Sequence, residues 1–328
     1  MPANLTPDYI KAEEKYKNAK TPQEKLEALH EMLATIPKHK GTEKMQADIK
    51  RRIAKLTDSS GKKGAKRTDF YFVPKEGAGQ VVLAGPPNSG KSSLLKKLTN
   101  AHPVIGEYPF STTTPVWGMI FFENIQIQLV DIPPVSPEFH EGWVFGIIRN
   151  ADLVIVVVDI ADDDSMDKIT FFFDALNQHK IFPVPESVKE TEDPAAKELK
   201  TIIAANKSDI GNFSENLELL KLTECKNFET FLTSSSESWD DKELKKQIFN
   251  KLDIIRIYTK QPGKEADKSD PVILHKGANL MDFAKAIHKD FAKNLKFARI
   301  WGDEVYPGQK VQHDFELRDE DIIELHIK

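Results

Sequence analysis

The chain has 328 residues, of which 40% are hydrophobic and 30% are charged, a composition typical of a folded protein with two or three domains. It contains one cysteine, Cys225, which excludes an internal disulfide and favours a reducing compartment. The longest wholly apolar run, residues 153–158, is far too short to cross a bilayer, and the first residues lack the apolar core of a secretory signal. We therefore expect a cytoplasmic protein and exclude the secreted, disulfide-rich and membrane-spanning classes.

The net charge of −5 is unevenly distributed along the chain. Residues 38–67 carry about +8 and the remaining residues about −13. This basic segment favours a polyanionic partner such as RNA, although a solvated helix face and linker give the same pattern. The same two interpretations hold for basic residues nearer the C-terminal end, which are His275, Lys276, Lys285, Lys289, Lys293, Lys296 and Arg299. No aromatic pattern typical of single-strand binders is obvious beside them.

Residues 1–67 predict a small helical arm followed by a basic linker. The stretch 21–24, TPQE, is a capping box with proline at the first helical position. Further helices are predicted to begin near Thr6 and Thr42. The apolar residues at helical spacing are Leu26, Leu29, Met32, Leu33, Ile36, Met45, Ile49, Ile53 and Leu56. Residues 59–67 are rich in Ser, Gly and Lys and have the composition of a linker.

From about residue 80, short apolar runs alternate with helical stretches, which predicts a doubly wound, mainly parallel α/β sheet covered by helices. The runs are 81–84, 125–130, 153–158, 202–205 and 231–232. The pattern changes near Ile254, where short strands, one helix near 280–291 and a final strand at 322–327 predict a small mixed α/β module. The predicted domains are therefore residues 1–67, 68–253 and 254–328.

A phosphate-binding loop is predicted at residues 85–92, GPPNSGKS, which match G-x-x-x-x-G-K-[ST] between a strand and a helix. The glycines let backbone N–H groups surround phosphates, and the start of the following helix adds positive potential. Lys91 is expected to pair with the β- and γ-phosphates, and the Ser92 hydroxyl to bind Mg²⁺. The residues expected to contact the nucleotide here are Gly85, Asn88, Ser89, Gly90, Lys91, Ser92 and Ser93.

A base-recognition loop is predicted at residues 206–209, NKSD, directly after an apolar strand. The Asp209 carboxylate can accept two hydrogen bonds from the ring and exocyclic nitrogens of guanine, and adenine offers no matching pair of donors. Asn206 and Lys207 complete this loop. Ser234 and Ser235 lie where a further guanine-contacting loop belongs, although a serine-rich turn also explains them.

Two further segments are predicted to sense the γ-phosphate. Residues 110–115, FSTTTP, offer hydroxyl groups that can close on Mg²⁺, with an ordinary Ser/Thr turn as the alternative. Asp131 ends the alternating strand 125–130, so its carboxylate is expected to reach the metal shell. A buried aspartate that caps the next turn is the alternative.

With these motifs in this order, the chain resembles the Obg-related GTPases, in the branch of the developmentally regulated GTP-binding (DRG-like) proteins. Segments similar to the C-terminal TGS domain of that branch, a ubiquitin-like β-grasp fold, are 255–260, 270–274, 287–291 and 298–302. The resemblance implies a P-loop GTPase sheet preceded by a helical arm and followed by a TGS domain. It also implies GTP and GDP as ligands, and Mg²⁺ held by Ser92, Asp131 and the threonine that aligns with the family's metal ligand, Thr112.

The chain departs from the family pattern after Asp131. The family motif D-x-P-G reads Asp131-Ile132-Pro133-Pro134 here, so the glycine whose N–H contacts the γ-phosphate is replaced by a residue without an N–H. Val135 occupies the position of the catalytic glutamine of Ras-type proteins, and a hydrophobic residue there is usual for this family. The candidates nearby for positioning water are Glu138, His140 and Glu141, with solvated loop residues as the alternative. Asn88 resembles an asparagine that holds K⁺ in several GTPases, and a turn asparagine is the other interpretation.

Two functions follow from this sequence. The first is a GTPase that hydrolyses GTP to GDP slowly with Mg²⁺, with Lys91 and Thr112 as catalytic residues and, from the resemblance, the ribosome or RNA as a partner. The second is a non-hydrolysing GTP-binding adaptor that binds RNA or protein through its helical arm and TGS domain. Pro134 favours the second function, whereas intact Lys91, Ser92, Thr112 and Asn88 favour the first. No DNA partner is expected.

Overall fold

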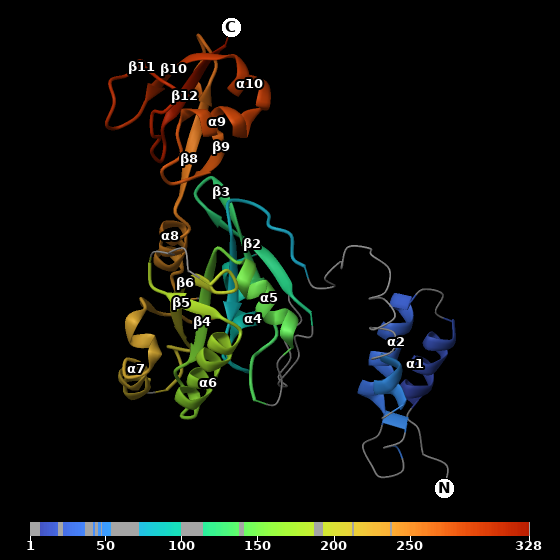
Figure 1. Cartoon of the computed structure of the whole chain (residues 1–328). Coiled ribbons are helices and arrows are strands. Elements are labelled where there is room, and N and C mark those ends of the chain that lie inside the picture. Colours follow the sequence, from blue (N-terminus) through green and yellow to red (C-terminus); the bar gives the residue numbers. More distant parts are fainter. Residues whose placement is uncertain are drawn as a thin grey trace. The chain divides into compact units, whose positions relative to one another are not determined.

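The computed structural model divides the chain into two compact units, Met1–Phe70 and Tyr71–Lys328, which are described separately (Figure 1). None of the helices in the ranges described below is long and apolar enough to cross a bilayer. The structure describes residues 7–18, 22–36, 42, 45–46, 48–53, 72–99, 114–137, 141–186, 193–211, 213–236 and 238–327.

The first unit is helical, as the sequence predicts. Helix α1 spans Pro7–Asn18 and helix α2 spans Pro22–Thr35, and residues 48–53 are also helical. Their apolar faces form one small core, whose buried members are Tyr9, Ala12, Leu29, Met32, Ile36 and Ile49. An ion pair of 2.8 Å between Lys15 and Glu31 joins α1 to α2. The predicted linker, residues 59–67, and the side chains of Leu26 and Leu56 lie outside the described part of the chain.

Seven strands in the described part of the second unit form one sheet, in the order β2-β3-β1-β4-β6-β5, with β7 also paired to β6 (Figure 1). The strands are β1 Gln80–Ala84, β2 Val116–Phe122, β3 Ile125–Asp131, β4 Leu153–Asp159, β5 Ile181–Val184, β6 Lys197–Asn206 and β7 Thr230–Leu232. All pairings are parallel except that of β2 with β3. The mainly parallel sheet expected from the sequence is therefore confirmed.

Helices cover both faces of this sheet. Successive residues of a strand point to opposite sides, and the strands are apolar at successive positions, so both faces must be buried. Helices α5 (Gly142–Asn150) and α6 (Ser165–Gln178) pack on one face, together with Val82, Val130 and Val156. Helices α4 (Lys91–Leu98) and α8 (Lys242–Lys251) pack on the other face. Phe172 is fully buried and Phe173 is 4% exposed in α6, so both belong to the core. Helix α7 (Ser214–Leu220) and the 3₁₀ turn η1 (Glu224–Asn227) complete this region.

A second sheet of five strands follows, in the order β11-β10-β12-β8-β9. Its strands are β8 Ile254–Lys260, β9 Ala266–His275, β10 Leu295–Trp301, β11 Gln309–Val311 and β12 Ile322–Ile327. Strands β8 and β12 are parallel and the other pairs are antiparallel. Helix α9 (Leu280–Ile287), which begins with a capping box between Asn279 and Asp282, closes one face of this sheet around fully buried Phe283.

Three sequence expectations need correction. The single helix expected near 280–291 is two helices, α9 and α10 (Lys289–Asn294), because His288 is extended and its side chain accepts the Asp290 N–H to start the second helix. Strands β2 and β5 were not expected. Strand β5 has only four residues and contains proline, so its strand signal is weak. Strand β2, VWGMIFF, is interrupted only by Gly118 and is otherwise rich in strand-forming residues, so the sequence did carry a signal for it.

The tip of the β2–β3 hairpin contacts the C-terminal sheet. Asn124 Nδ2 donates to Tyr258 Oη at 2.8 Å and to the Lys268 carbonyl at 3.0 Å. Arg256 is 4% exposed and forms ion pairs with Glu123 of the hairpin and with Asp319 and Glu320 of its own module. Its guanidinium also lies 5.0 Å from the Phe249 ring centroid, so a single side chain bridges the two sheets.

We expect Arg256→Met to lower the free energy of unfolding by about 1–3 kcal/mol, because it leaves three carboxylates near one another without their cation. The carboxylates are partly exposed, which keeps the loss below that of a fully buried pair. Urea unfolding followed by circular dichroism measures the change. Arg318→Met is the control, since Arg318 pairs with Glu304 on the open surface and its loss is expected to cost less than about 0.5 kcal/mol. Equal midpoints for the two variants would contradict this account.

Candidate nucleotide-binding site

The predicted phosphate, metal and base residues meet at one edge of the large sheet. The phosphate loop follows β1, Asp131 ends β3, which pairs with β1, and Asn206 ends β6. Strands β1 and β6 both pair with β4 in parallel, so their carboxyl ends lie at the same edge. Ligands of doubly wound sheets bind at this edge, beside the strand where the chain order reverses.

The phosphate loop depends on two glycines with positive φ. Gly85 has φ +135°, and a Cβ there would lie 2.6 Å from the Val157 carbonyl oxygen. Gly90 has φ +92°, and a Cβ there would lie 2.2 Å from the Asn206 side-chain nitrogen. Larger residues are therefore excluded by both backbone conformation and space. The Asn206 nitrogen donates to the Ser89 carbonyl at 2.8 Å, which ties the base-recognition loop to the phosphate loop.

Lys91 is held inside the phosphate loop. Its Nζ donates to the carbonyls of Pro86 at 2.7 Å and Gly85 at 3.2 Å, and the residue is 7% exposed. Burial lowers the pKa of Lys91 to about 8, and the nearby Asp131 carboxylate partly opposes that change. A buried ammonium that faces only carbonyls and one carboxylate would be stabilised by an anion such as a phosphate.

The Ser92 hydroxyl and Asp131 form a pair of oxygen ligands suited to Mg²⁺. Ser92 Oγ donates to Asp131 Oδ2 at 2.5 Å, while the buried Asp131 Oδ1 has no hydrogen-bond partner. Burial raises the pKa of Asp131 to about 6, against the lowering effects of Lys91 and Ser92. An unpartnered buried carboxylate oxygen beside a hydroxyl fits a hard cation, which prefers oxygen ligands. Among the described residues, no group of three or more His, Cys, Asp or Glu side chains is placed to hold a metal ion.

The segment after Asp131 is folded into the core. Pro133, Pro134 and Val135 are buried. Proline has no N–H, and the Val135 N–H donates to the Gly85 carbonyl at 3.3 Å. The first backbone donor after Pro134 therefore points at the phosphate loop itself, and Val135 packs with the core residues on the α5 and α6 face of the sheet.

The base-recognition loop is held by a network of side chains. Lys207 has φ +66° and its Nζ donates to Asp159 Oδ2 at 2.5 Å. Asp209 is exposed at the surface, and Ser234 Oγ donates to its Oδ1 at 2.6 Å. The predicted pair Asp209 and Ser234 is thus brought together from two separate loops. Ser235 is exposed beside them.

Two residues of this network were not expected from the sequence. Thr233 Oγ1 donates to Asn206 Oδ1 at 3.2 Å, and the Thr233 carbonyl accepts the Ser208 N–H at 3.1 Å. Asp159 ends β4 and positions Lys207. Both residues lie at strand ends, the position that pointed to Asp131, so the same signal could have identified them.

The remaining predicted residues give a mixed result. Thr112, with the rest of the loop 110–113, lies outside the described residues, as do Glu138 and His140. Glu141 accepts a hydrogen bond from the Trp143 ring nitrogen and is the N-cap residue directly before α5. Asn88 is exposed with φ +58°, a conformation that asparagine adopts readily in turns, so both interpretations of Asn88 remain. Ser93 is partly buried in the first turn of α4.

Comparison with known proteins agrees with this arrangement. Residues 80–207 match the family model described as 50S ribosome-binding GTPase, and residues 255–327 match the TGS domain model. An uncharacterized GTP-binding protein of Methanocaldococcus jannaschii is 27% identical, with 93% of each chain covered. Developmentally-regulated GTP-binding protein 1 of Xenopus laevis is 25% identical, with 89% of this chain and 95% of the relative covered. The chain is a DRG-like GTP-binding protein with a C-terminal TGS domain.

Solved structures give a weaker likeness. The FeoB G-domain of Methanococcus jannaschii is 19% identical with a TM-score of 0.35, and the match covers 53% of this chain and 97% of that one. A single-residue variant of Era from Aquifex aeolicus, bound to GDP.AlF4⁻, is 19% identical with a TM-score of 0.41 and a match over 70% of this chain and 73% of that one. The sheet order and the phosphate loop, rather than these scores, establish the P-loop GTPase fold of this chain, and the second sheet is its TGS domain.

We expect Asp209→Asn to weaken GTP binding by about 10-fold or more, which corresponds to about 1.4 kcal/mol. The carboxylate has two oxygens that accept the two guanine N–H donors, and the asparagine amide replaces one of these oxygens by an NH₂ group that donates. The same change should improve xanthosine triphosphate relative to GTP, since xanthine presents a carbonyl where guanine has its amino group. Titration with both nucleotides measures the effect. Asp240→Asn, an exposed carboxylate before α8, is the control and should change neither affinity. Unchanged GTP affinity in Asp209→Asn would remove Asp209 from the base site.

Proposed function

We propose that this protein is a guanine-nucleotide switch that hydrolyses GTP to GDP slowly with Mg²⁺, in a reducing compartment such as the cytoplasm, and associates with the ribosome or another RNA. The observation that carries hydrolysis is the cluster of Lys91, Ser92 and Asp131 beneath the phosphate loop, in which Asp131 Oδ1 lacks a partner. We keep residues 1–67, 68–253 and 254–328 as the proposed arm, GTPase domain and TGS domain.

The proposed chemistry is electrostatic. Lys91 would leave the Gly85 and Pro86 carbonyls to pair with β- and γ-phosphate oxygens, where its charge offsets the negative charge that develops on the transferred group. Ser92 and Asp131, with Thr112 from the loop 110–115, are the proposed ligands of Mg²⁺, which would neutralise the same phosphates. Gly85, Asn88, Ser89, Gly90 and Ser93 line the loop as further proposed phosphate contacts.

A non-hydrolysing adaptor is the second candidate, and the segment after Asp131 favours it. Pro134 has no N–H to donate to a γ-phosphate, and the Val135 N–H is bonded to the Gly85 carbonyl. Val135, at the position of the catalytic glutamine of Ras-type proteins, is apolar and only 1% exposed, so it cannot orient a water. With this segment, the protein would bind GTP without hydrolysing it, and its other domains would bind a partner.

Support for an RNA or ribosomal partner comes from two sources. One family model that matches the GTPase domain is described as ribosome-binding. The sequence also carries the basic stretch 38–67, most of which lies outside the described residues. Phosphate-rich partners bind such segments with strong salt dependence.

Single-turnover hydrolysis of radiolabelled GTP distinguishes the two candidates. We expect slow release of phosphate that rises with added ribosomes and is about 100-fold or more lower in Lys91→Ala. The rate should be higher in KCl than in NaCl, and Asn88→Ala should remove that difference if Asn88 holds K⁺. Phosphate release no faster than that of Lys91→Ala, with GTP still bound, would establish the adaptor instead.

We expect the wild-type protein to bind GDP and a non-hydrolysable GTP analogue with affinities within about tenfold, because a charge-assisted hydrogen bond of about 1.5–3 kcal/mol is absent at Pro134. Pro134→Gly should raise the preference for the triphosphate analogue, since it restores an N–H and frees φ. Isothermal titration measures both ligands.

The matched control is Pro133→Gly, which gives the neighbouring residue of the same buried segment the same backbone freedom. It should leave the ratio of the two affinities near the wild-type value. A hundredfold preference for the triphosphate in the wild type, or the same ratio in all three proteins, would show that this segment does not set the preference.

A further inference from the structure

The TGS domain has a sheet face that no helix of its own covers. Helices α9 and α10 pack on one face, around Ile257, Ala298 and Ile300. Alternate residues of the same strands point to the other face. Figure 1 shows both helices on one side of the strands β8, β10 and β12. The opposite side is therefore available to a ligand over the part that the GTPase domain does not contact.

Aromatic rings and cations alternate across this open face. On β10, Phe297, Arg299 and Trp301 point outward. The Phe297 ring stacks on His326 of β12 with centroids 4.4 Å apart, and Lys310 Nζ of β11 lies 4.3 Å from the Phe297 centroid.

Trp301, at the other end of β10, has the same kind of neighbour. Lys260 Nζ of β8 lies 4.5 Å from its ring centroid. Two aromatic–cation pairs thus lie about 13 Å apart along one strand, with the exposed Arg299 between them.

Around Phe297 and Trp301 the face carries more cations than carboxylates, whereas Glu123, Asp319 and Glu320 surround Arg256 at its edge. Arg299 and Lys310 are cross-strand neighbours and both are exposed. Among the described residues of β8, β10, β11 and β12 that point to this face, the one carboxylate is Glu324. It is 6% exposed, and it pairs with Lys260 at 2.7 Å and with His326 at 2.8 Å. Its charge is therefore balanced within the protein, while those of Arg299 and Lys310 face the solvent.

This combination of groups fits single-stranded RNA. Aromatic side chains on an open sheet bind bases by stacking, and cations beside them bind the phosphates that link those bases. An acidic peptide without aromatic residues would use the cations but has no group that stacks on the rings. A duplex presents its phosphates but keeps its bases stacked inside, so it could not reach Phe297 or Trp301. Rings and cations on the same face therefore favour unpaired bases over the other two ligands.

We propose that the open sheet face of the TGS domain, formed by Phe297, Arg299, Trp301, Lys310 and His326, binds single-stranded RNA. This inference rests on the proposed association with RNA and deepens it, since it names the surface and the kind of RNA. On binding, a base displaces the Lys310 ammonium from the Phe297 ring, and the ammonium then pairs with a phosphate.

The proposed surface continues to the contact with the GTPase domain. Tyr258 and Arg256 lie on the same strand and the same face as Lys260, and they contact Asn124 and Glu123 of the β2–β3 hairpin. RNA held at Trp301 and Lys260 therefore lies next to the hairpin whose strand β3 ends at Asp131.

Fluorescence anisotropy of labelled ten-nucleotide oligouridine and oligoadenosine with the full chain tests the proposal. We expect Phe297→Ala, Trp301→Ala and the charge reversals Arg299→Glu and Lys310→Glu each to weaken binding by about 10-fold or more. Removing one cation should also reduce the slope of log affinity against log salt by about 0.7. Phe297→Leu, which keeps the apolar bulk but not the ring, should weaken binding with an unchanged unfolding midpoint.

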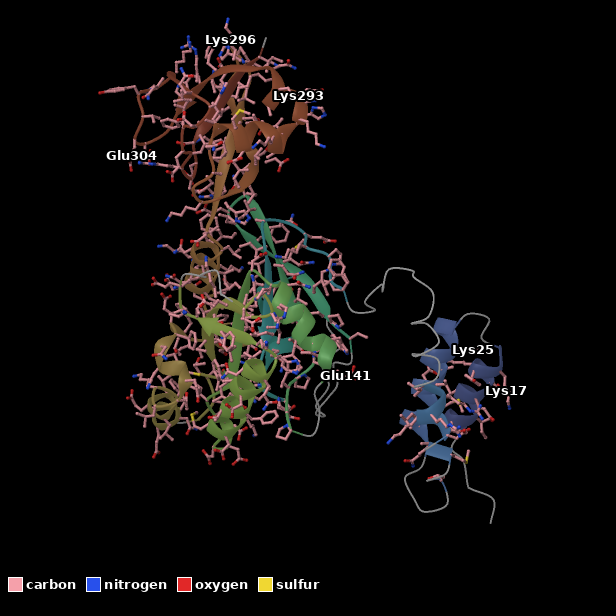
Figure 2. All side chains as sticks on the ribbon, in the orientation of Figure 1. Lys17, Lys25, Glu141, Lys293, Lys296 and Glu304 are labelled. Carbon is pink, nitrogen blue, oxygen red and sulfur yellow. The ribbon has the colours of Figure 1, made fainter. Side chains whose placement is uncertain are left out.

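The controls are Lys289→Glu and Lys293→Glu on α10, which make the same charge change on the helical side. Figure 2 shows Lys293 on the α10 side of the domain. These variants should keep affinity within about twofold, because they alter net charge without altering the open face.

Three results would overturn the proposal: no binding of either oligonucleotide, equal losses in the helical and sheet variants, or competition by polyglutamate or duplex RNA as strong as that by single strands. GTP hydrolysis of the same samples, measured without RNA and with ribosomes, separates this outcome from failure of the proposed function. Hydrolysis that ribosomes stimulate, in a protein whose sheet variants bind oligonucleotides normally, would retain the switch and reject this surface.

Discussion

The burial of Lys91 beside Asp131 is the constraint on which the nucleotide site depends. Two opposite charges under the phosphate loop are costly to desolvate, and the ammonium is compensated by two carbonyls and by the nearby Asp131 carboxylate. The glycines at positions 85 and 90 make this arrangement possible, because they let the loop turn tightly enough to enclose the lysine. The protein thus holds a cation and an unpartnered carboxylate oxygen where a nucleotide phosphate and its metal would relieve both.

Strand β3 connects this site to the rest of the second unit. Its carboxyl end is Asp131, and its other end begins at the hairpin residues Glu123 and Asn124, which contact the TGS domain. Strands β2 and β3 are paired without interruption, from Val116 opposite Asp131 to Phe122 opposite Ile125. They therefore form one continuous ribbon between the nucleotide site and the contact with the TGS domain. At the far end, Arg256 pairs with Glu123 of the ribbon, while Asp319 and Glu320 of its own domain hold its guanidinium in place.

The basic residues of the TGS domain fall into two groups with different positions in the structure. The basic residues of the TGS domain look like one patch in the sequence, but folding divides them. Lys285, Lys289 and Lys293 lie on helices, whereas Arg299 lies on the open sheet face with Lys310. The aromatic pattern that the sequence does not reveal arises there, because Phe297 and Trp301 from one strand meet His326, Lys260 and Lys310 from three others.

The sequence by itself determined the elements that local rules control. The phosphate loop, the NKSD loop and Asp131 could be found because each follows a short apolar strand at a fixed spacing, and parallel strands bring their ends to one edge. Only the tertiary structure decided the links between distant segments. These are the Ser234 bond to Asp209, the Thr233 bond to Asn206 and the use of the Val135 N–H by Gly85. Such contacts join residues far apart in the chain, and their geometry depends on strand order and packing, which no local pattern of residues encodes.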